Sequence, residues 1–337
     1  MNFSQIVTGV AVSLLTQLAL AAELVEVPIG ISPVMSSAGV YIAVAKGYFE
    51  LEGIKPKLIA FEGSGAKMVP ALATGDLLVA GGNINAGVYN AISNDIPIKI
   101  VADKGTVSPG HGYLALLVRK DLADSGRYKT YADIKGMTMA VTAKGVSQEI
   151  VTEMYLKKAG LTLADINLLP LAYKDMNIAF ANKSLDATIQ IEPLVTAAVE
   201  QGFAVRIEGN DLIYPNQQSA ALFYSPVFME KYPDLAAGFM VAYVKALRDY
   251  NDAFDKHKGK TELIELLVKA GALKDAATGA KMIPVGLHPD GKLNIAGLKS
   301  DAQWFKDKSY LETLPNMDKV VDQNYVEHAV RVLGPYQ

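Results

Sequence analysis

The sequence predicts an α/β fold built from two similar lobes, and three observations lead to this prediction. Short β-branched segments alternate with segments of helical periodicity, which is typical of strand–helix–strand units on a largely parallel sheet. This alternation runs through residues 25–102 and then begins again at residue 114. The 337 residues exceed the usual size of one hydrophobic core and are enough for two.

The first series of elements begins with VEVPIGI, a loosely alternating segment at 25–31. Strands are expected at 25–31, 55–61, 77–80 (ended by Gly81-Gly82) and 98–102, and helices at 39–49, 66–74 and 85–93. Gly75 stands where a glycine commonly terminates a helix, at the end of the 66–74 segment. These elements form the first lobe.

The second series repeats this architecture without close sequence identity. Strands are expected at 114–118, 137–141, 168–171, 187–191 and 204–207, with helices at 145–159, 177–182 and 193–201. After a last strand at 220–224 the pattern becomes helical over 226–232, 234–254 and 261–270, and a final helix contains 327–330. We expect these segments to form a helical cover packed on one lobe.

The composition excludes several classes of function. The chain contains no cysteine, so thiol catalysis, disulfides and Cys-ligated metal are excluded. The formal net charge of −3 offers no overall positive field for nucleic acid. Four histidines (His111, His257, His288 and His328) lie far apart without metal-ligand spacing. Neither nucleic acid, nor a metal, nor a cofactor is expected.

Residues 1–22 predict a signal peptide. The segment MNFSQIVTGVAVSLLTQLALAA carries no charged side chain, has an apolar run and ends in an A-x-A cleavage pattern. Cleavage is expected after Ala21 or Ala22, although the n-region lacks Lys or Arg. A membrane anchor is the alternative, but the polar residues within the span make it short and weak. We expect an exported, periplasmic protein.

The glycine-rich turn in FEGSGAKMVPALATGD, residues 61–76, is the first candidate for ligand binding. Met68 stands where a dinucleotide fingerprint needs its third glycine, and Gly65-Ala66-Lys67 does not supply a Walker A loop. The N–H groups at the start of the following helix could still hold an anion. The alternative is that the glycines only allow close strand–helix packing.

Other candidates follow the carboxyl ends of predicted strands, where ligands bind in open α/β sheets. Ser36 and Ser37 could instead cap a helix, Glu192 could mark a helix start, and any tyrosine could be a core residue. Ser147 and Thr142 are both candidates to cap the first helix of the second lobe. The candidate ligand-binding residues are Ser36, Ser37, Tyr41, Gly63, Ser64, Gly65, Gly82, Asn83, His111, Tyr113, Thr142, Ser147 and Glu192.

Five ordered segments resemble the substrate-binding proteins of ABC importers, in the group that binds nitrate, sulfonates, taurine and thiamine precursors. The segments are AGVYIAVAKGYFELEGI (38–54), FEGSGAKMVPALATGDLLVAGG (61–82), HGYLALLVRKDL (111–122), YADIKGMTMAV (131–141) and AALFYSPVFMEKYPD (220–234). Thr74 replaces the small Ala or Ser that the group has before Gly75-Asp76. The resemblance covers most of the mature chain.

The resemblance implies a type II periplasmic binding fold, in which two α/β lobes joined by a two-strand hinge close on a ligand. Lobe I would comprise residues 23–112 plus 218–337, and lobe II residues 113–217. It also implies a membrane ABC permease as partner, and a monomer, as is usual for such receptors.

For function, the resemblance implies a receptor that captures a small organic anion, a sulfonate or carboxylate with an aromatic body allowed. The alternative ligand is a thiamine-precursor pyrimidine, which Glu192 and Tyr113 could hold. A less favoured alternative is an enzyme on the same fold. The related desulfinases need a cysteine, which this chain lacks, and no G-x-S-x-G nucleophile elbow is present.

Overall fold

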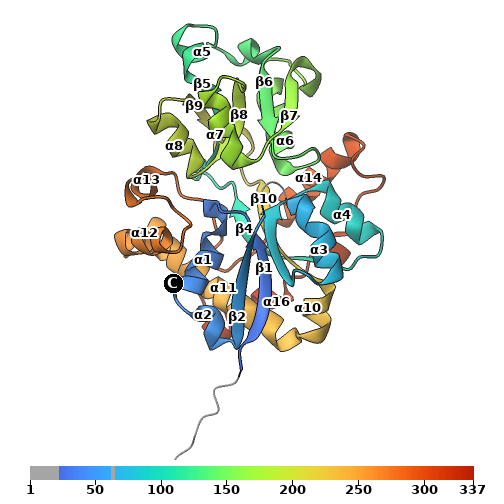
Figure 1. Cartoon of the computed structure of the whole chain (residues 1–337). Helices are drawn as coiled ribbons and strands as arrows, with labels where there is room; N and C mark the ends of the chain where they lie inside the picture. Colours follow the sequence, from blue (N-terminus) through green and yellow to red (C-terminus); the bar gives the residue numbers. More distant parts are fainter. Residues whose placement is uncertain (1–22, 62–64) are drawn as a thin grey trace, which may run out of the picture.

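The computed structural model describes residues 23–61 and 65–337, which form two five-stranded sheets one above the other (Figure 1). The predicted signal peptide at 1–22, and Gly63 and Ser64, lie outside the described residues. We call the part around the first sheet lobe I and the part around the second lobe II. The predicted division into two similar α/β lobes therefore agrees with the observed architecture.

In lobe I, the sheet order is β2-β1-β3-β10-β4. Its strands are β1 (Val25–Ile31), β2 (Ile54–Ala60), β3 (Val79–Asn83), β4 (Lys99–Thr106) and β10 (Gln218–Tyr224). β1 pairs in parallel with β2 and β3, whereas β10 runs antiparallel between β3 and β4. The strand that returns from lobe II thus completes the first sheet.

The lobe II sheet repeats this plan, with the order β7-β6-β8-β5-β9. Its strands are β5 (Leu114–Arg119), β6 (Thr138–Val141), β7 (Asn167–Pro170), β8 (Ala187–Ile191) and β9 (Ala204–Gly209). Here β5, the strand that enters from lobe I, runs antiparallel between β8 and β9. All the predicted strands are present among the described residues.

Helices flank both sheets (Figure 1). Lobe I has the 3₁₀ turns η1 (Met35–Ser37) and η2 (Gly65–Met68) and the helices α1 (Ala38–Ala45), α2 (Tyr48–Leu51), α3 (Val69–Thr74) and α4 (Ala86–Ser93). Lobe II has η3 (Tyr131–Ile134), η4 (Leu163–Asp165), α5 (Lys120–Asp124), α6 (Ser147–Lys157), α7 (Tyr173–Ala181), α8 (Leu194–Glu200) and α9 (Asn210–Ile213).

Three local predictions are corrected by the backbone. The helix expected at 39–49 breaks into α1 and α2 because Gly47 adopts a left-handed conformation, with φ of 68°. The helix expected at 66–74 begins with the 3₁₀ turn η2, although Gly75 does cap its end with φ of 83°. β3 continues through Gly81 and Gly82, where the sequence predicted its end.

The C-terminal segment supplies α10 (Pro226–Lys231), α11 (Pro233–Phe254), α12 (Lys260–Lys269), α13 (Ala276–Lys281), α14 (Ile295–Asp307), α15 (Met317–Val320) and α16 (Asn324–Leu333). The buried apolar face of α11 packs on α1 and α16, as expected for a cover on lobe I. Two further helices that the sequence did not predict reach lobe II, because α13 contacts α8 and α14 contacts α6.

Two connections join the lobes, one between β4 and β5 and one between β9 and β10. The predicted lobe boundaries at 112/113 and 217/218 lie within these connections and remain a prediction. Backbone hydrogen bonds also cross directly between the lobes, from Ala86 N–H to Gly145 C=O at 2.9 Å and from Ser147 N–H to Ile84 C=O at 3.0 Å. The lobes are therefore in direct contact where residues 84–86 meet residues 145–147.

Candidate functional site

A small polar cavity lies between the two lobes, and we call it the inner cavity. Elements of both lobes and of the hinge form its wall. The lining residues are Ser36, Asn83, Tyr113, Leu114, Ser147, Gln148, Val151, Tyr173, Ile191, Gln217, Ser219 and Ala220. Most of these side chains are hydroxyls or amides, and none of the lining residues is a carboxylate.

The topology explains why these residues meet. Ser36 follows β1, Asn83 ends β3, and Ile191 ends β8, so each lies at the carboxyl end of a parallel strand. Ser147 and Gln148 begin α6, which follows β6. Because the two sheets present these ends to each other, loops distant in sequence line one cavity.

A chain of hydroxyl groups crosses the hinge beside the inner cavity. The Tyr113 hydroxyl donates to Ser219 Oγ at 2.5 Å, and Ser219 Oγ donates to Gly105 C=O at 2.8 Å. Burial raises the pKa of the Tyr113 phenol well above its ordinary value, so the phenol keeps its proton. Gly105 is required here, because a Cβ at this position would lie 2.6 Å from the Tyr113 oxygen.

Lys104, on β4, lies directly behind the cavity wall. Its side chain is 1% exposed, and its ammonium donates to Ser36 Oγ at 2.9 Å. Burial lowers the pKa of Lys104 to about 7, and Asp103 opposes this shift. Among the residues that the structure describes, no carboxylate forms an ion pair with this lysine.

Gln217 links the inner cavity to the C-terminal segment. Its Nε2 donates to Asp301 Oδ2 at 3.1 Å and to Ser147 C=O at 3.3 Å. These two acceptors fix the orientation of the amide, and they leave Oε1 buried without a partner among the described atoms. Asp301 is itself buried and receives a second hydrogen bond from the Tyr214 hydroxyl at 3.0 Å.

A second space adjoins the inner cavity at Tyr173, and we call it the outer chamber. It is partly open to solvent and largely apolar, with residues of both lobes in its wall. The lining residues are Ser32, Pro33, Val34, Phe61, Ala172, Tyr173, Lys174 and Leu194. Burial raises the pKa of Tyr173 to about 12, and its hydroxyl accepts a long hydrogen bond from Asn83 Nδ2 at 3.5 Å.

Four of the predicted site residues line the inner cavity: Ser36, Asn83, Tyr113 and Ser147. Ser37 occupies the N-cap position of α1, as the alternative expected, but its side chain makes no capping hydrogen bond. Ser36 Oγ accepts from Lys104, Ser37 Oγ donates to Ser32 C=O, and Ser147 Oγ donates to Ser219 C=O across the lobes. The N-cap residue of α6 is Val146, which corrects the choice between Ser147 and Thr142.

Three further predicted residues are buried near the cavity but do not line it. Gly82 is a paired residue of β3 opposite Ala221. Thr142 N–H donates to Gln148 Oε1 at 2.7 Å, while Thr142 Oγ1 has no partner among the described atoms. Ser37 packs at the start of α1.

Glu192 takes the structural role that its position before Pro193 favoured. Its carboxylate accepts hydrogen bonds from Thr196 N–H and Thr196 Oγ1, both at 3.0 Å, and from Ile283 N–H at 3.3 Å. Burial raises its pKa, and these hydrogen bonds oppose that shift. The carboxylate therefore joins the first turn of α8 to the C-terminal segment.

Two predicted residues lie elsewhere. Tyr41 is on α1 and lines a surface groove with Glu262 of α12, because its position on the helix faces the C-terminal cover. His111 lies behind the hinge, where its Nδ1 is 3.2 Å from Pro284 C=O and its Nε2 is 3.7 Å from Asp255 Oδ1. Gly65 begins η2, and the rest of its turn lies outside the described residues.

Sequence reasoning missed Lys104, Gln148, Tyr173, Gln217 and Ser219. Lys104 and Ser219 lie within strands, and Gln217 lies in a hinge connection. The sequence prediction placed the site in loops that follow parallel strands, so it did not include them. Lys104 lies two residues beyond the strand predicted at 98–102, and only the observed extension of β4 to Thr106 places it in the sheet.

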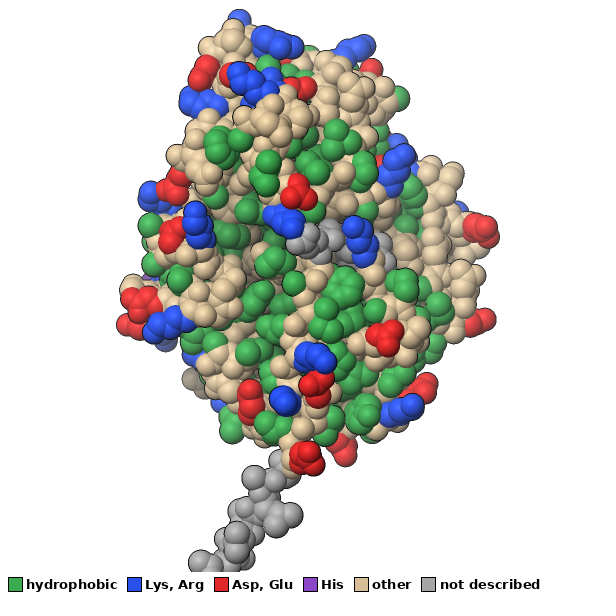
Figure 2. Space-filling model, in the orientation of Figure 1, with side chains coloured by type: hydrophobic (Ala, Val, Ile, Leu, Met, Phe, Trp, Pro, Cys, Tyr) green, Lys and Arg blue, Asp and Glu red, His purple; other side chains and the backbone are tan. Residues whose placement is uncertain are grey.

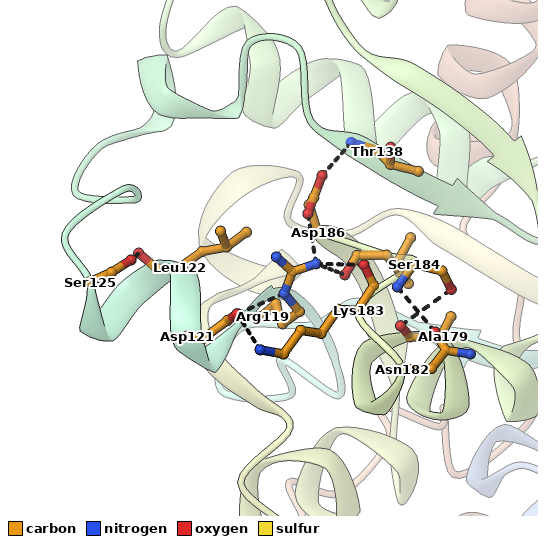
Figure 3. A network of polar contacts seen from close by, with 11 residues as sticks. Arg119, Asp121, Leu122, Ser125, Thr138, Ala179, Asn182, Lys183, Ser184 and Asp186 are labelled. Carbon is orange, nitrogen blue, oxygen red and sulfur yellow. Dashed lines mark hydrogen bonds and ion pairs between the residues drawn. The ribbon is translucent and has the colours of Figure 1, made fainter.

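An ion-pair network in lobe II lies at the opposite end of β5 from the cavity (Figure 3). Arg119 contacts Asp121 at 2.6 Å and Asp186 at 2.9 Å, and it donates to Lys183 C=O at 2.9 Å. Asp186 in turn accepts from Thr138 N–H at 2.9 Å. The network joins β5, β6 and the turn before β8, so it stabilises the lobe rather than the site.

The charge distribution on the face in Figure 2 points to no further site. Figure 2 shows acidic and basic side chains interspersed on the face it presents, without a continuous strip of one sign among the described residues. Within 23–61 and 65–337, no cluster of acidic or histidine side chains is suited to a metal ion. No helix in that part of the chain has the length and apolarity needed to span a membrane.

Two lobes of equal topology, crossed by two connections and closed over a polar cavity, define the type II periplasmic binding fold. A family model described as the NMT1-like family matches residues 20–268. The chain belongs to the NMT1-like family. A comparison with curated proteins finds no match.

Solved structures show the same fold. The alkanesulfonate-binding protein SsuA from Xanthomonas axonopodis pv. citri, bound to MOPS, is 19% identical with a TM-score of 0.72, over 90% of this chain and 100% of that one. The periplasmic nitrate-binding protein NrtA from Synechocystis PCC 6803 is 15% identical with a TM-score of 0.72, over 93% and 90%. The desulfurization enzyme DSZB is 14% identical with a TM-score of 0.60, over 91% and 99%.

Proposed function

We propose that this protein is the solute-binding receptor of an ABC importer and captures a small organic anion between its lobes. The observation that carries the proposal is the inner cavity, whose wall comes from both lobes and contains mostly uncharged hydroxyl and amide side chains. A ligand held there would touch both lobes at once, so binding and closure would be coupled. Lys104 behind the wall favours a carboxylate or sulfonate.

The thiamine-precursor alternative is less well supported. A bound pyrimidine would need the Glu192 carboxylate as its partner. This carboxylate already accepts three hydrogen bonds, from Thr196 and Ile283. An enzyme is also disfavoured, although DSZB has a similar fold. The chain has no cysteine, and among the described residues no histidine or carboxylate lines the inner cavity to act as a base.

Delivery to a membrane permease, export to the periplasm and a monomeric state complete the proposal. Export rests on the sequence of residues 1–22 and on the similarity to periplasmic binding proteins.

Thermal melting with a panel of small molecules tests the receptor function. Matched pairs separate charge from shape: methanesulfonate with methanesulfonamide, and benzoate with benzamide. A ligand at 100 times its Kd should add about 2.7 kcal/mol to the free energy of unfolding. Native mass spectrometry of the purified protein would identify a retained ligand. Chemical conversion of a bound compound, or the absence of any retained or stabilising small anion, would contradict the proposal.

A further inference from the structure

We propose that the anionic group of the ligand docks on the Lys104 ammonium beside Ser36, and that the receptor selects small carboxylates or sulfonates that also carry a hydrogen-bond donor. This inference rests on the proposed function, since it takes the inner cavity as the ligand site. It places the negative end of the ligand at β4 rather than at the glycine turn of residues 63–65.

The first argument is the missing counter-charge. An ammonium group can donate three hydrogen bonds, and Ser36 Oγ accepts one of them at 2.9 Å. Asp103 is adjacent on β4, but neighbouring residues of a strand face opposite sides. Its oxygens accept from Gln218 Nε2 at 2.6 Å and from His288 N–H at 2.7 Å instead. A buried ammonium without a paired carboxylate is costly, and an anionic ligand would offset that cost.

The second argument is that the sheet is shaped to hold this lysine. A Cβ on Gly81 would lie 2.7 Å from both Cδ and Cε of Lys104, and Leu222 Cδ2 is 3.0 Å from the same position. Glycine at 81 therefore leaves the channel along which the lysine reaches Ser36. Since Ser36 lines the inner cavity, an anion that displaces or shares this hydrogen bond would meet the ammonium from the cavity side.

The third argument concerns the other end of the ligand. Gln217 lines the same cavity, and its Oε1 is a buried acceptor without a partner among the described atoms. Asp301 and Ser147 hold the Nε2 side of the amide, so the acceptor cannot be exchanged for a donor. An N–H or O–H group on the ligand would satisfy Oε1, whereas a ligand without a donor would leave it unpaired.

This arrangement couples binding to protonation. Burial lowers the pKa of Lys104 to about 7 in the ligand-free protein. The Lys104 side chain packs against Gly81, Leu222 and Ser36, none of which titrates. Within the described chain, Asp103 is the charged residue whose field affects the pKa of Lys104. An anion favours the charged form and raises this pKa. Affinity should therefore be highest below pH 7 and fall above it, by up to tenfold per pH unit until the pKa of the complex is reached.

Isothermal titration calorimetry on the full-length mature protein tests the inference, with the tightest anion of the melting panel as the probe. Lys104→Met should weaken binding roughly 10- to 150-fold, which is the usual effect of removing a charge-assisted hydrogen bond. Lys99→Met, at the other end of β4, is the matched control and should bind normally. Lys104→Met should also melt at a higher temperature than the wild type without ligand at pH 7, because a buried charge has been removed.

The outcomes separate this inference from the proposed function. If the wild type binds no anion of the panel, the proposed function fails first. If the wild type binds an anion and the affinity of Lys104→Met is within twofold of the wild-type affinity, the anion lies elsewhere. The same conclusion follows if Gly65→Asp abolishes binding while Lys104→Met does not. Should Lys104→Met fail to fold, wild-type titrations at pH 8 in two buffers of different ionisation enthalpy decide: proton uptake supports the inference, and its absence overturns it.

Discussion

Ionisable side chains are buried at the junction of the two lobes: Asp103, Lys104 and Asp301 are each at most 1% exposed. Ionisable groups are rarely fully buried, because each must be solvated by other protein groups. Asp103 and Asp301 receive hydrogen bonds from hinge residues, Gln218 and Gln217 respectively, so they position the strands and amides of the site. Lys104 makes one hydrogen bond, to Ser36 Oγ, and no ion pair among the described residues.

Asp301 provides a pH-dependent test of the hinge. Burial raises its pKa from 3.8 to about 7, so the folded chain binds more protons than the unfolded chain between these values. Stability should therefore fall as the pH rises from about 4 to about 7. Asp301→Asn removes this titration, and its melting temperature should decline less over that range than that of the wild type.

The exposed Asp307, on the same helix α14, supplies the control for that experiment. Asp307→Asn should reproduce the wild-type pH profile. Parallel pH profiles for the wild type and Asp301→Asn would mean that Asp301 does not titrate in this window.

At the scale of elements, helix α14 joins the C-terminal segment to helix α6 of lobe II. Glu153 on α6 is 2% exposed and accepts from Trp304 Nε1 at 2.5 Å and from Lys308 Nζ. Burial alone would raise the pKa of Glu153, but these two hydrogen bonds outweigh it and the pKa is lowered. Tyr310 adds hydrogen bonds to both oxygens of Glu149, at 2.9 and 3.1 Å.

Glu153→Gln should weaken the closed arrangement of the lobes. A contact of about 1 kcal/mol that exists only when the lobes are closed changes ligand affinity by roughly fivefold. We expect this loss in calorimetry, with a faster ligand dissociation rate. Glu208→Gln is the control, because Glu208 bonds Tyr131 and Lys158 within lobe II. A lower melting temperature with unchanged affinity would show that α6 and α14 stay together in the open form.

The order of elements was predictable to a large extent. β1 and β8 were predicted with their observed bounds, since most of their residues are buried and each strand is paired along its length, β1 in parallel with β2 and β8 antiparallel with β5. β3 was misplaced because glycines usually end a strand, and here they continue it to make room for Lys104. Tyr41 was assigned to the site because it follows a strand-end loop, but one helical turn directs it to α12.

At the scale of the whole molecule, the chain carries its own reporter of closure. Trp304 is the single tryptophan of the sequence, and its indole N–H bonds Glu153 in lobe II. A ligand that draws the lobes together should change the Trp304 emission spectrum and lower the radius of gyration measured by small-angle scattering. A stabilising ligand that changes neither quantity would show that binding does not move the lobes.

By itself, the sequence determined the two series of alternating elements, the helical cover and the absence of thiol chemistry, because periodicity and composition are local properties. It also carried the family resemblance that the NMT1-like model supports. Only the tertiary structure decided which side chains share the cavity, because β10 inserts between β3 and β4 and brings the hinge to residues from both lobes. The same insertion buries Lys104 beside Ser36, and such a contact depends on strand order, which no local pattern encodes.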